Sequence, residues 1–285
     1  SAYPFPSVAP YGGNFGWTGG DRKQAADLNS KYNALQIQAE KRFSNGLQFQ
    51  SSYTFQHAIQ TSFSGVGFAR YVNIDPKINY GPNESYRNHV FILSQVYDLP
   101  VGKGKKWVSD VGPLANAIVG GWTLNTATNF SSGLPWTAGL HDCSASIDQG
   151  PCMPDVVGSV KAGTRSGDPK GSGYWYQTTN GVSLDALGKT AGSWGQTATL
   201  DGFGNAGIGA FRGPKFFNIN AGLFKTVSFG ERAKAQFQFQ AFNFFNHVNL
   251  ALPDRCVDCS SGGSITDLTP GAQMRRLQFG LKLSF

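Results

Sequence analysis

Residues 276–285 read Arg-Leu-Gln-Phe-Gly-Leu-Lys-Leu-Ser-Phe, and their alternation decides the fold class. Every second residue is apolar from Leu277 to Phe285, while the residues between them are Gln, Gly, Lys and Ser. Strict alternation is typical of a β-strand, because successive side chains point to opposite faces. This strand therefore has one wholly apolar face and one face that is polar or bare.

The same alternation recurs upstream of this stretch. Residues 233–241 alternate Ala and Phe with Lys and Gln, and residues 217–223 alternate apolar residues with Asn and Gly. Near the amino end, two alternating stretches are joined by Ser44-Asn45-Gly46, and Asn-Gly is a strong tight-hairpin signal. We predict strands near residues 32–43, 47–60, 86–98, 119–132, 215–227, 231–247 and 274–285.

The connections between these strands alternate in length. The links at 44–46, 101–118 and 228–230 are compact, whereas the links at 61–85, 133–214 and 248–273 are long and irregular. All long loops then fall at one end of the sheet. Outer-membrane barrels have this asymmetry, with short periplasmic turns and long extracellular loops. The pattern favours such a barrel over a soluble β-sandwich.

Composition excludes several other classes. Of the 285 residues, 40% are hydrophobic, only 14% are charged and 13% are aromatic, and 37 are Gly. A disordered chain is poor in aromatics, and a helical membrane protein needs runs of about 20 apolar residues, which are missing here. The polar strand faces carry Gln, Asn, Ser and Thr and few charges, as a water-filled lumen can. Aromatics near the strand ends fit interface girdles: Tyr53, Phe55, Tyr86, Tyr97, Trp107, Trp122, Trp136, Phe229 and Phe245.

The net charge of +7 raises the question of nucleic-acid binding, which needs basic residues clustered on one element. The single dense cluster is Gly102-Lys103-Gly104-Lys105-Lys106, in a turn, so we expect no nucleic-acid partner. The amino end has no Met and no signal-peptide pattern, which fits a mature product, an expression product or a fragment.

Four cysteines form two local pairs, Cys143 with Cys152 and Cys256 with Cys259, each in a polar loop. Even-numbered pairs in loops fit an oxidising compartment. A Cys-x-x-Cys motif is alternatively redox-active or half of a zinc site, but a closed zinc site needs four ligands and no second half with this spacing follows. We favour loop disulfides over a metal.

We find no catalytic constellation and no cofactor motif. The four His residues are scattered, and neither a Gly-x-Ser-x-Gly elbow nor a His-Glu-x-x-His motif is present. Residues 202–207 match Gly-x-Gly-x-x-Gly but neither follow a strand nor open a helix, so we read them as a loop. Aromatics of the 133–214 loop are weak candidates for sugar stacking, and the alternative is that they pack the loop's own core: Trp136, Tyr174, Trp175, Tyr176 and Trp194.

Residues 276–285 also resemble the last strand of bacterial outer-membrane barrels, which usually ends in an aromatic that the barrel-assembly machinery reads. The resemblance gives this signal role to Phe279 and Phe285. Further blocks resemble the carboxyl-terminal region of TonB-dependent receptors, of the type with a carboxypeptidase-regulatory-like domain that is common in Acidobacteria. They include Tyr32-Asn33-Ala34-Leu35-Gln36, Tyr97-Asp98-Leu99-Pro100-Val101-Gly102, Ser132-Gly133-Leu134-Pro135-Trp136 and Arg212-Gly213-Pro214.

The resemblance implies active nutrient import across the outer membrane, with a chelated metal, oligosaccharide or peptide as substrate. Such receptors have about 22 strands and a plug through which TonB acts. Seven predicted strands are too few even for a small barrel of about eight strands. We therefore expect an all-β, antiparallel transmembrane segment of a larger barrel over 1–285, with 1–31 as the lead-in from an extracellular loop, strands and loops over 32–285, and a large loop over 133–214.

Two alternatives remain open at this stage. One is a small self-contained outer-membrane barrel that acts as a pore or adhesin. The other is a secreted all-β module that binds glycans. If the chain is a segment of a larger receptor barrel, we expect its partners to be outer-membrane lipid, the barrel-assembly machinery, the rest of the barrel and its plug.

Overall fold

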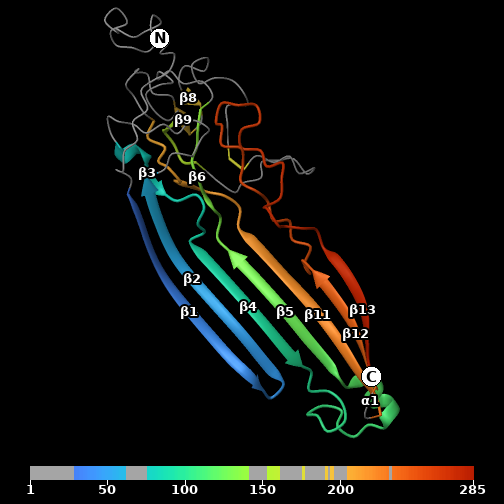
Figure 1. The fold of residues 1–285 in the computed structure, drawn as a ribbon. Helices are drawn as coiled ribbons and strands as arrows, with labels where there is room; N and C mark the ends of the chain where they lie inside the picture. The colour runs from blue at the N-terminus through green and yellow to red at the C-terminus, as the bar shows by residue number, and fades with distance from the viewer. Residues whose placement is uncertain are drawn as a thin grey trace, which may run out of the picture.

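The computed structural model describes residues 29–61, 76–140, 153–160, 175–176, 190–191, 193–195, 204–230 and 233–285. Its main element is one antiparallel sheet in the order β1-β2-β4-β5-β11-β12-β13, with the short β3 paired to β2. The long strands are β1 Ser30–Ser44, β2 Leu47–Thr61, β4 His89–Asp98, β5 Trp122–Ser131, β11 Phe216–Phe229, β12 Ala233–Phe242 and β13 Arg276–Ser284. They lie side by side in a single twisted layer (Figure 1). All seven predicted strands are confirmed, and each long strand pairs with the long strand that precedes it.

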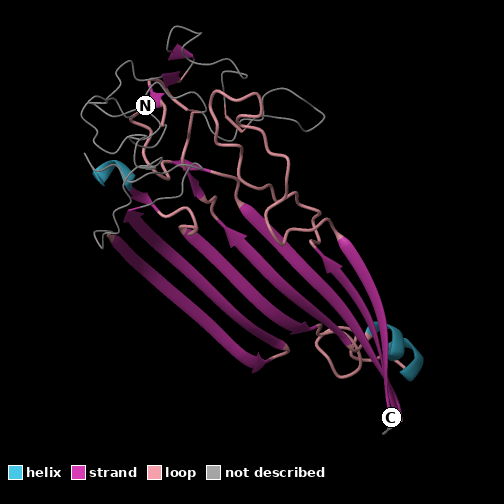
Figure 2. Cartoon of the chain, turned by 45° about the horizontal axis from the view of Figure 1, so that its top comes forward, coloured by secondary structure: helices cyan, strands magenta, loops and turns pink. Residues whose placement is uncertain are grey.

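The smaller elements lie in the connections. They are η1 Pro76–Asn79, β3 Tyr80–Pro82, α1 Pro113–Val119, β6 Pro135–Trp136, β7 Asp155–Val156, β8 Thr190–Ala191, β9 Trp194–Gly195 and β10 Phe211–Arg212. All of them except α1 lie at the end of the sheet that carries the long loops, which we call the long-loop end (Figure 2). The opposite, short-turn end carries the hairpin turns, α1 and the carboxyl terminus (Figure 1). The predicted separation of long and short connections is confirmed.

Local chemistry explains where the strands begin and end. Asn45 and Gly46 both have positive φ, 52° and 79°, which the tight turn between β1 and β2 requires. The prediction that a strand continues to residue 247 is wrong, because β12 ends at Phe242. Asn243 and Asn246 take positive φ there, and the Asn243 amide side chain bonds both the N–H and the C=O of His247, which closes a turn.

The register aligns the two faces across the whole sheet. Phe239 lies opposite Phe279 with ring centroids 5.1 Å apart, while Gln240 lies opposite Gln278. The same phase continues into β11, where Leu223 pairs with both Phe239 and Leu124. A slip of one residue would exchange the faces, so the alternation of the sequence fixes this register.

Both outer strands of the sheet are open. Within the described ranges, β1 pairs only with β2, and β13 pairs only with β12. Nearly every residue of β1 and all of β13 are exposed. The sheet is therefore not a closed barrel, and its edges present unpaired backbone groups that hydrocarbon does not tolerate.

Candidate functional site

The polar face of the sheet is rich in amide side chains. Gln236 and Gln238 of β12 form a hydrogen-bonded row, since Gln238 Nε2 donates to Gln236 Oε1 at 2.9 Å. Gln236 Nε2 in turn donates to Thr226 Oγ1 of β11 at 3.3 Å. Amides both donate and accept hydrogen bonds, so this face can bind water or an uncharged polar solute.

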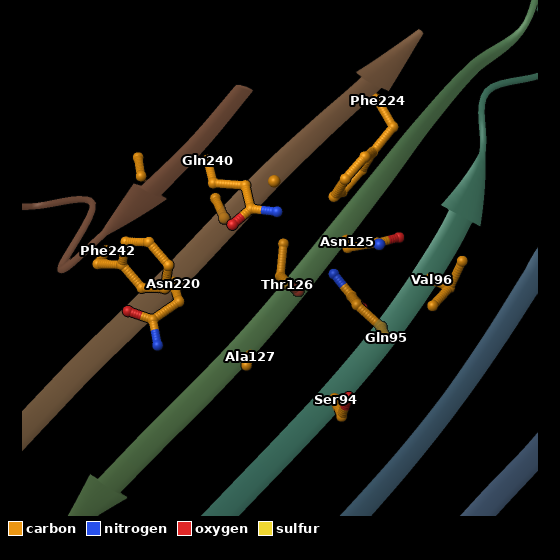
Figure 3. Close-up of a pocket in the computed structure, with 13 residues that line it drawn as sticks. Ser94, Gln95, Val96, Asn125, Thr126, Ala127, Asn220, Phe224, Gln240 and Phe242 are labelled. Carbon is orange, nitrogen blue, oxygen red and sulfur yellow. The ribbon is translucent and has the colours of Figure 1, made fainter. Parts of the chain in front are cut away.

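A hollow of about 300 Å³ lies on the sheet where β4, β5, β11 and β12 adjoin (Figure 3). Gly222 is central to its shape, because a Cβ there would meet the Phe224 ring at 2.8 Å. The Phe224 ring therefore packs across the bare backbone of Gly222. Residues that line the hollow from the polar face are Ser94, Val96, Asn125, Ala127, Asn220, Gly222, Phe224, Gln240 and Phe242.

One acceptor in this hollow has no protein partner. Asn125 Oδ1 is buried, and no described residue donates a hydrogen bond to it. A buried amide oxygen without a partner costs about 1–3 kcal/mol, so the sheet is locally destabilised at this position. A second hollow of about 200 Å³ shares Asn220 and Phe242 with the first and extends toward the long-loop end. The two hollows adjoin on the polar face of the sheet.

Charged groups on the polar face lie toward its ends. Asp98 and Lys234 lie toward the short-turn end, since the register sets them against residues at or next to the strand ends. Lys282 lies toward the same end, two residues before the last residue of β13. Arg276 lies toward the long-loop end, with its guanidinium 4.9 Å from the centroid of the Phe242 ring. The middle of the face is left to uncharged amide, hydroxyl and apolar groups. A small neutral solute would therefore meet hydrogen-bonding groups and two phenyl rings there.

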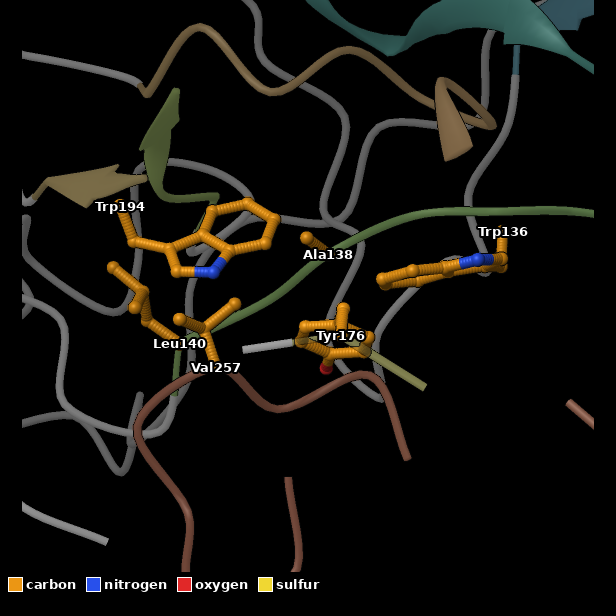
Figure 4. Close-up of a cluster of buried hydrophobic side chains, with 6 residues drawn as sticks. All are labelled: Trp136, Ala138, Leu140, Tyr176, Trp194 and Val257. Atoms are coloured by element: carbon orange, nitrogen blue, oxygen red, sulfur yellow. The ribbon is translucent and has the colours of Figure 1, made fainter. Parts of the chain in front are cut away.

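The long-loop end holds an aromatic cluster (Figure 4). Trp136 stacks on Tyr176 at a centroid distance of 4.8 Å, and Tyr176 meets Trp194 edge-on at 5.8 Å. Phe211 contacts both tryptophan rings, at 5.0 and 5.5 Å. The buried members of this cluster are Trp136, Ala138, Leu140, Tyr176, Trp194 and Val257. Segments far apart in the sequence thus share one small core.

Burial decides between the two sequence readings of these aromatics. Trp136, Tyr176 and Trp194 are at most 1% exposed, so no ring face is open to a sugar. Trp175 is half-buried and its Nε1 donates to the carbonyl of Arg212 at 3.0 Å. Tyr174 lies outside the described residues. The arrangement favours the alternative that the loop aromatics form a core, and it places Trp136 in this core rather than in an interface girdle.

Polar contacts tie the long loops to one another. Glu84 accepts a hydrogen bond from Thr137 Oγ1 at 2.6 Å and pairs with Arg255 Nη1 at 2.9 Å. Thr137 Oγ1 also accepts the N–H of Gly209 at 2.8 Å. The loops that follow β2, β5 and β12 therefore meet at a single carboxylate. We call these interlocked segments, together with the aromatic cluster, the loop layer.

Electrostatics in the loop layer follow from burial. Burial raises the pKa of the Tyr176 phenol well above its usual value, and the nearby Asp254 carboxylate adds to the effect. The phenol stays neutral and donates to the carbonyl of Asp254 at 2.6 Å. Partial burial lowers the pKa of both Arg87 and Arg212 from the usual value for arginine. Arg87 donates to the carbonyl of Ser132 at 2.6 Å and remains a structural cation.

The disulfide predicted between Cys256 and Cys259 is confirmed, with Cα atoms 5.4 Å apart. Asp258 lies close enough to both sulfurs to suggest a metal site. Because the two sulfurs are bonded to each other, neither offers the thiolate that a metal would need. Cys143 and Cys152 lie outside the described residues.

Some features of the site escaped sequence reasoning. Phe224 carries an aromatic ring on a strand face otherwise occupied by Asn218, Asn220 and Gly222. This departure from the polar pattern could have marked the position of the hollow in the sequence. Glu84 and Arg255 are 171 positions apart in sequence, and no pattern in one sequence joins them. The same holds for Phe211, which follows a run of Gly and Ala without periodicity.

No helix within the described residues is both long and apolar enough to cross a bilayer. A family model described as an outer membrane beta barrel domain matches residues 4–278. The chain belongs to this family. The protein therefore resides in the bacterial outer membrane. Searches of curated proteins and of solved structures found no match.

Membership of the outer membrane beta barrel family assigns a solvent to each face. Apolar residues in line with Leu223, Phe237 and Leu281 face lipid, while the amide-rich face lines the lumen. The long-loop end is extracellular and the short-turn end periplasmic. Phe279 and Phe285, the predicted assembly signal, lie within and directly after the open edge strand β13 and are 75% and 95% exposed. Their recognition by the assembly machinery stays a prediction.

Proposed function

We propose that this chain is part of the wall of a TonB-dependent receptor that imports a nutrient through a larger barrel. The observation that carries the proposal is the open sheet, whose described edge strands β1 and β13 each pair on one side alone. A wall with two such edges needs further strands before it can face lipid. The order of the sequence blocks that resemble these receptors supports the proposal that the larger barrel is a TonB-dependent receptor.

The lumen face supports a substrate that forms hydrogen bonds and carries little charge. The hollow at Gly222 combines the amide side chains of Asn220 and Gln240 with the rings of Phe224 and Phe242. Amides and aromatic rings together suit sugars and peptide groups, which present hydroxyl or amide groups beside apolar faces. The transport cycle that we propose requires a plug and TonB and includes no catalytic step.

The first test is the intact mass of the polypeptide that carries this chain, extracted from outer membranes. The proposal expects about three times the 30.6 kDa of this chain, as a barrel of about 22 strands requires. A polypeptide of 30.6 kDa that migrates as a heat-modifiable barrel by itself would contradict it and favour a small pore or adhesin.

A second test addresses transport directly. Gly222→Trp should fill the lumen hollow and reduce nutrient uptake, because the new side chain projects from the polar face. Ala221→Trp is the matched control, because Ala221 is the neighbour of Gly222 on the same strand and its side chain faces lipid. Deletion of TonB should abolish the same uptake. Uptake that survives TonB deletion would refute energised import, even if Gly222→Trp blocks passage.

A further inference from the structure

The short helix α1 at the periplasmic end exposes its apolar side. Leu114 and Ile118, one turn apart, are 86% and 72% exposed. Asn116 is the helix's one polar residue and is half-buried against the preceding loop, where its Oδ1 accepts the N–H of Lys103 at 2.7 Å. A helix on a water-soluble surface has the opposite arrangement, with polar residues outward.

Two contacts hold α1 on the lipid side of the sheet. Trp122 Nε1 donates to the carbonyl of Ile118 at 2.9 Å, and Lys225 Nζ donates to the carbonyl of Gly120. Trp122 and Lys225 lie opposite each other in the register, on the same face as Leu223. The end of the helix is therefore fixed to the face that meets lipid. Figure 1 shows α1 at the short-turn end of the sheet, and this end lies at the edge of the bilayer.

The loop before α1 adds positive charge at the same level. Lys103, Lys105 and Lys106 are all exposed, and Asp110 is the one acidic residue between positions 99 and 121. Trp107 and Val108, directly after the lysines, are 55% and 53% exposed. Tryptophan prefers the membrane interface, and lysine beside a membrane binds anionic headgroups.

We propose that residues 103–118 form a periplasmic anchor that inserts into the inner leaflet of the outer membrane and binds anionic phospholipid. Leu114, Ile118 and Trp107 enter the boundary between headgroups and acyl chains, and the three lysines contact phosphate groups. Exposed apolar side chains beside clustered cations match such a monolayer in both polarity and charge. The anchor rests on the family assignment and the outer-membrane location, and it is independent of any transported substrate.

The experiment uses the whole polypeptide that carries this chain, reconstituted in phosphatidylethanolamine vesicles with or without phosphatidylglycerol. Phospholipids brominated on their acyl chains quench tryptophan only on contact. The signal that Trp107 contributes is the difference between the parent protein and Trp107→Phe. We expect bromolipid to quench this signal, and we expect Leu114→Gln with Ile118→Gln to reduce the quenching.

Charge variants test the headgroup preference separately. Replacing Lys103, Lys105 and Lys106 by Gln should lower the preference for phosphatidylglycerol at low salt by about fivefold per lysine, since each contributes about 1 kcal/mol near an anionic surface. Replacement by Arg keeps the charge and should keep the preference. Heat-modifiable migration shows that every variant still forms its barrel.

Two results would overturn the anchor. One is a Trp107 signal that an aqueous quencher reduces and bromolipid does not, which would place the segment in the periplasm and available to a protein partner. The other is a phosphatidylglycerol preference that is unchanged in the Gln variant.

Discussion

The sheet and the loop layer are stabilised in different ways. Along the sheet, side chains are mostly exposed or half-buried, and Ala235 and Ala241 are the buried apolar residues of its described long strands. The loop layer instead buries Trp136, Tyr176 and Trp194 almost completely. One chain therefore combines a wall whose apolar residues face lipid with an extracellular part that has its own water-excluding core.

This difference shows that hydrophobic side chains face lipid in one region of the molecule and are buried away from water in the other. In the sheet, backbone hydrogen bonds and the surrounding lipid maintain the strands, so apolar side chains face outward. In the loop layer, water drives the same kinds of side chain inward. Substitutions should separate the two regions, because a change that damages one has little reason to disturb the other.

The largest effect should come from the loop core. Trp136→Ala removes a side chain that is fully buried, and such truncations cost about 3–5 kcal/mol. We expect rapid proteolysis of the extracellular loops with unchanged heat-modifiable migration of the barrel. Val157→Ala, at a side chain that is 56% exposed, is the control and should leave the proteolysis rate unchanged. Loss of the barrel itself in Trp136→Ala would show that the two regions are not independent.

The next effect separates the two faces of the sheet. Phe239 and Gln238 are neighbours in β12, and they point to the lipid and the lumen respectively. Phe239 pairs with Leu223 in the middle of β11. Phe239→Arg places a charge in hydrocarbon and should cost about 2–4 kcal/mol near the bilayer midplane. Gln238→Arg should be nearly neutral. The measurement is the denaturant midpoint in vesicles, and equal midpoints for the two variants would contradict the assigned faces.

A smaller effect is expected from the disulfide. Cys256→Ser opens a short loop next to Val257, which belongs to the loop core. The chain-entropy relation gives about 2 kcal/mol for a loop of this length. Proteolysis of the loop layer should accelerate less than in Trp136→Ala. A reducing agent should produce the same change in the parent protein. If neither the substitution nor the reducing agent changes the proteolysis rate, the disulfide does not stabilise the loop layer.

The smallest effect is a pH dependence confined to the loop layer. Burial raises the pKa of Tyr176, so in the folded state its phenol keeps a proton that the unfolded chain loses above about pH 10. Stability is therefore complete below that pH and falls as pH rises, by up to about 1.4 kcal/mol per pH unit. Tyr176→Phe should flatten this dependence, as measured by proteolysis between neutral and alkaline pH. An unchanged slope would show that Tyr176 does not carry it.

Sequence reasoning was most successful where the periodicity was strict. Residues 276–285 and 233–241 alternate without error, and their register follows from keeping apolar residues on one face. The prediction was wrong from residue 243, where Asn243 leaves the strand for the left-handed region and bonds His247. Asparagine tolerates both states, so its sequence context alone did not decide between strand and turn.

The candidate site was less accessible to sequence reasoning. The loop aromatics were found as a group, but their number gave no information on whether the rings are exposed or buried. That depends on Phe211 and Val257, which come from segments with no shared pattern. The lumen hollow depends on Gly222 and Phe224 packing against each other and on two neighbouring strands that present Asn125 and Gln240 beside them.

The amino-acid sequence by itself determined the strands, their two faces and the separation of long loops from short turns, because these follow from local alternation and connection length. The tertiary structure alone decided which loops interlock and which edges stay open. It also decided that α1 turns its apolar side outward, next to Trp122. Such contacts join residues far apart in the chain, and their energies depend on where neighbouring side chains lie in space.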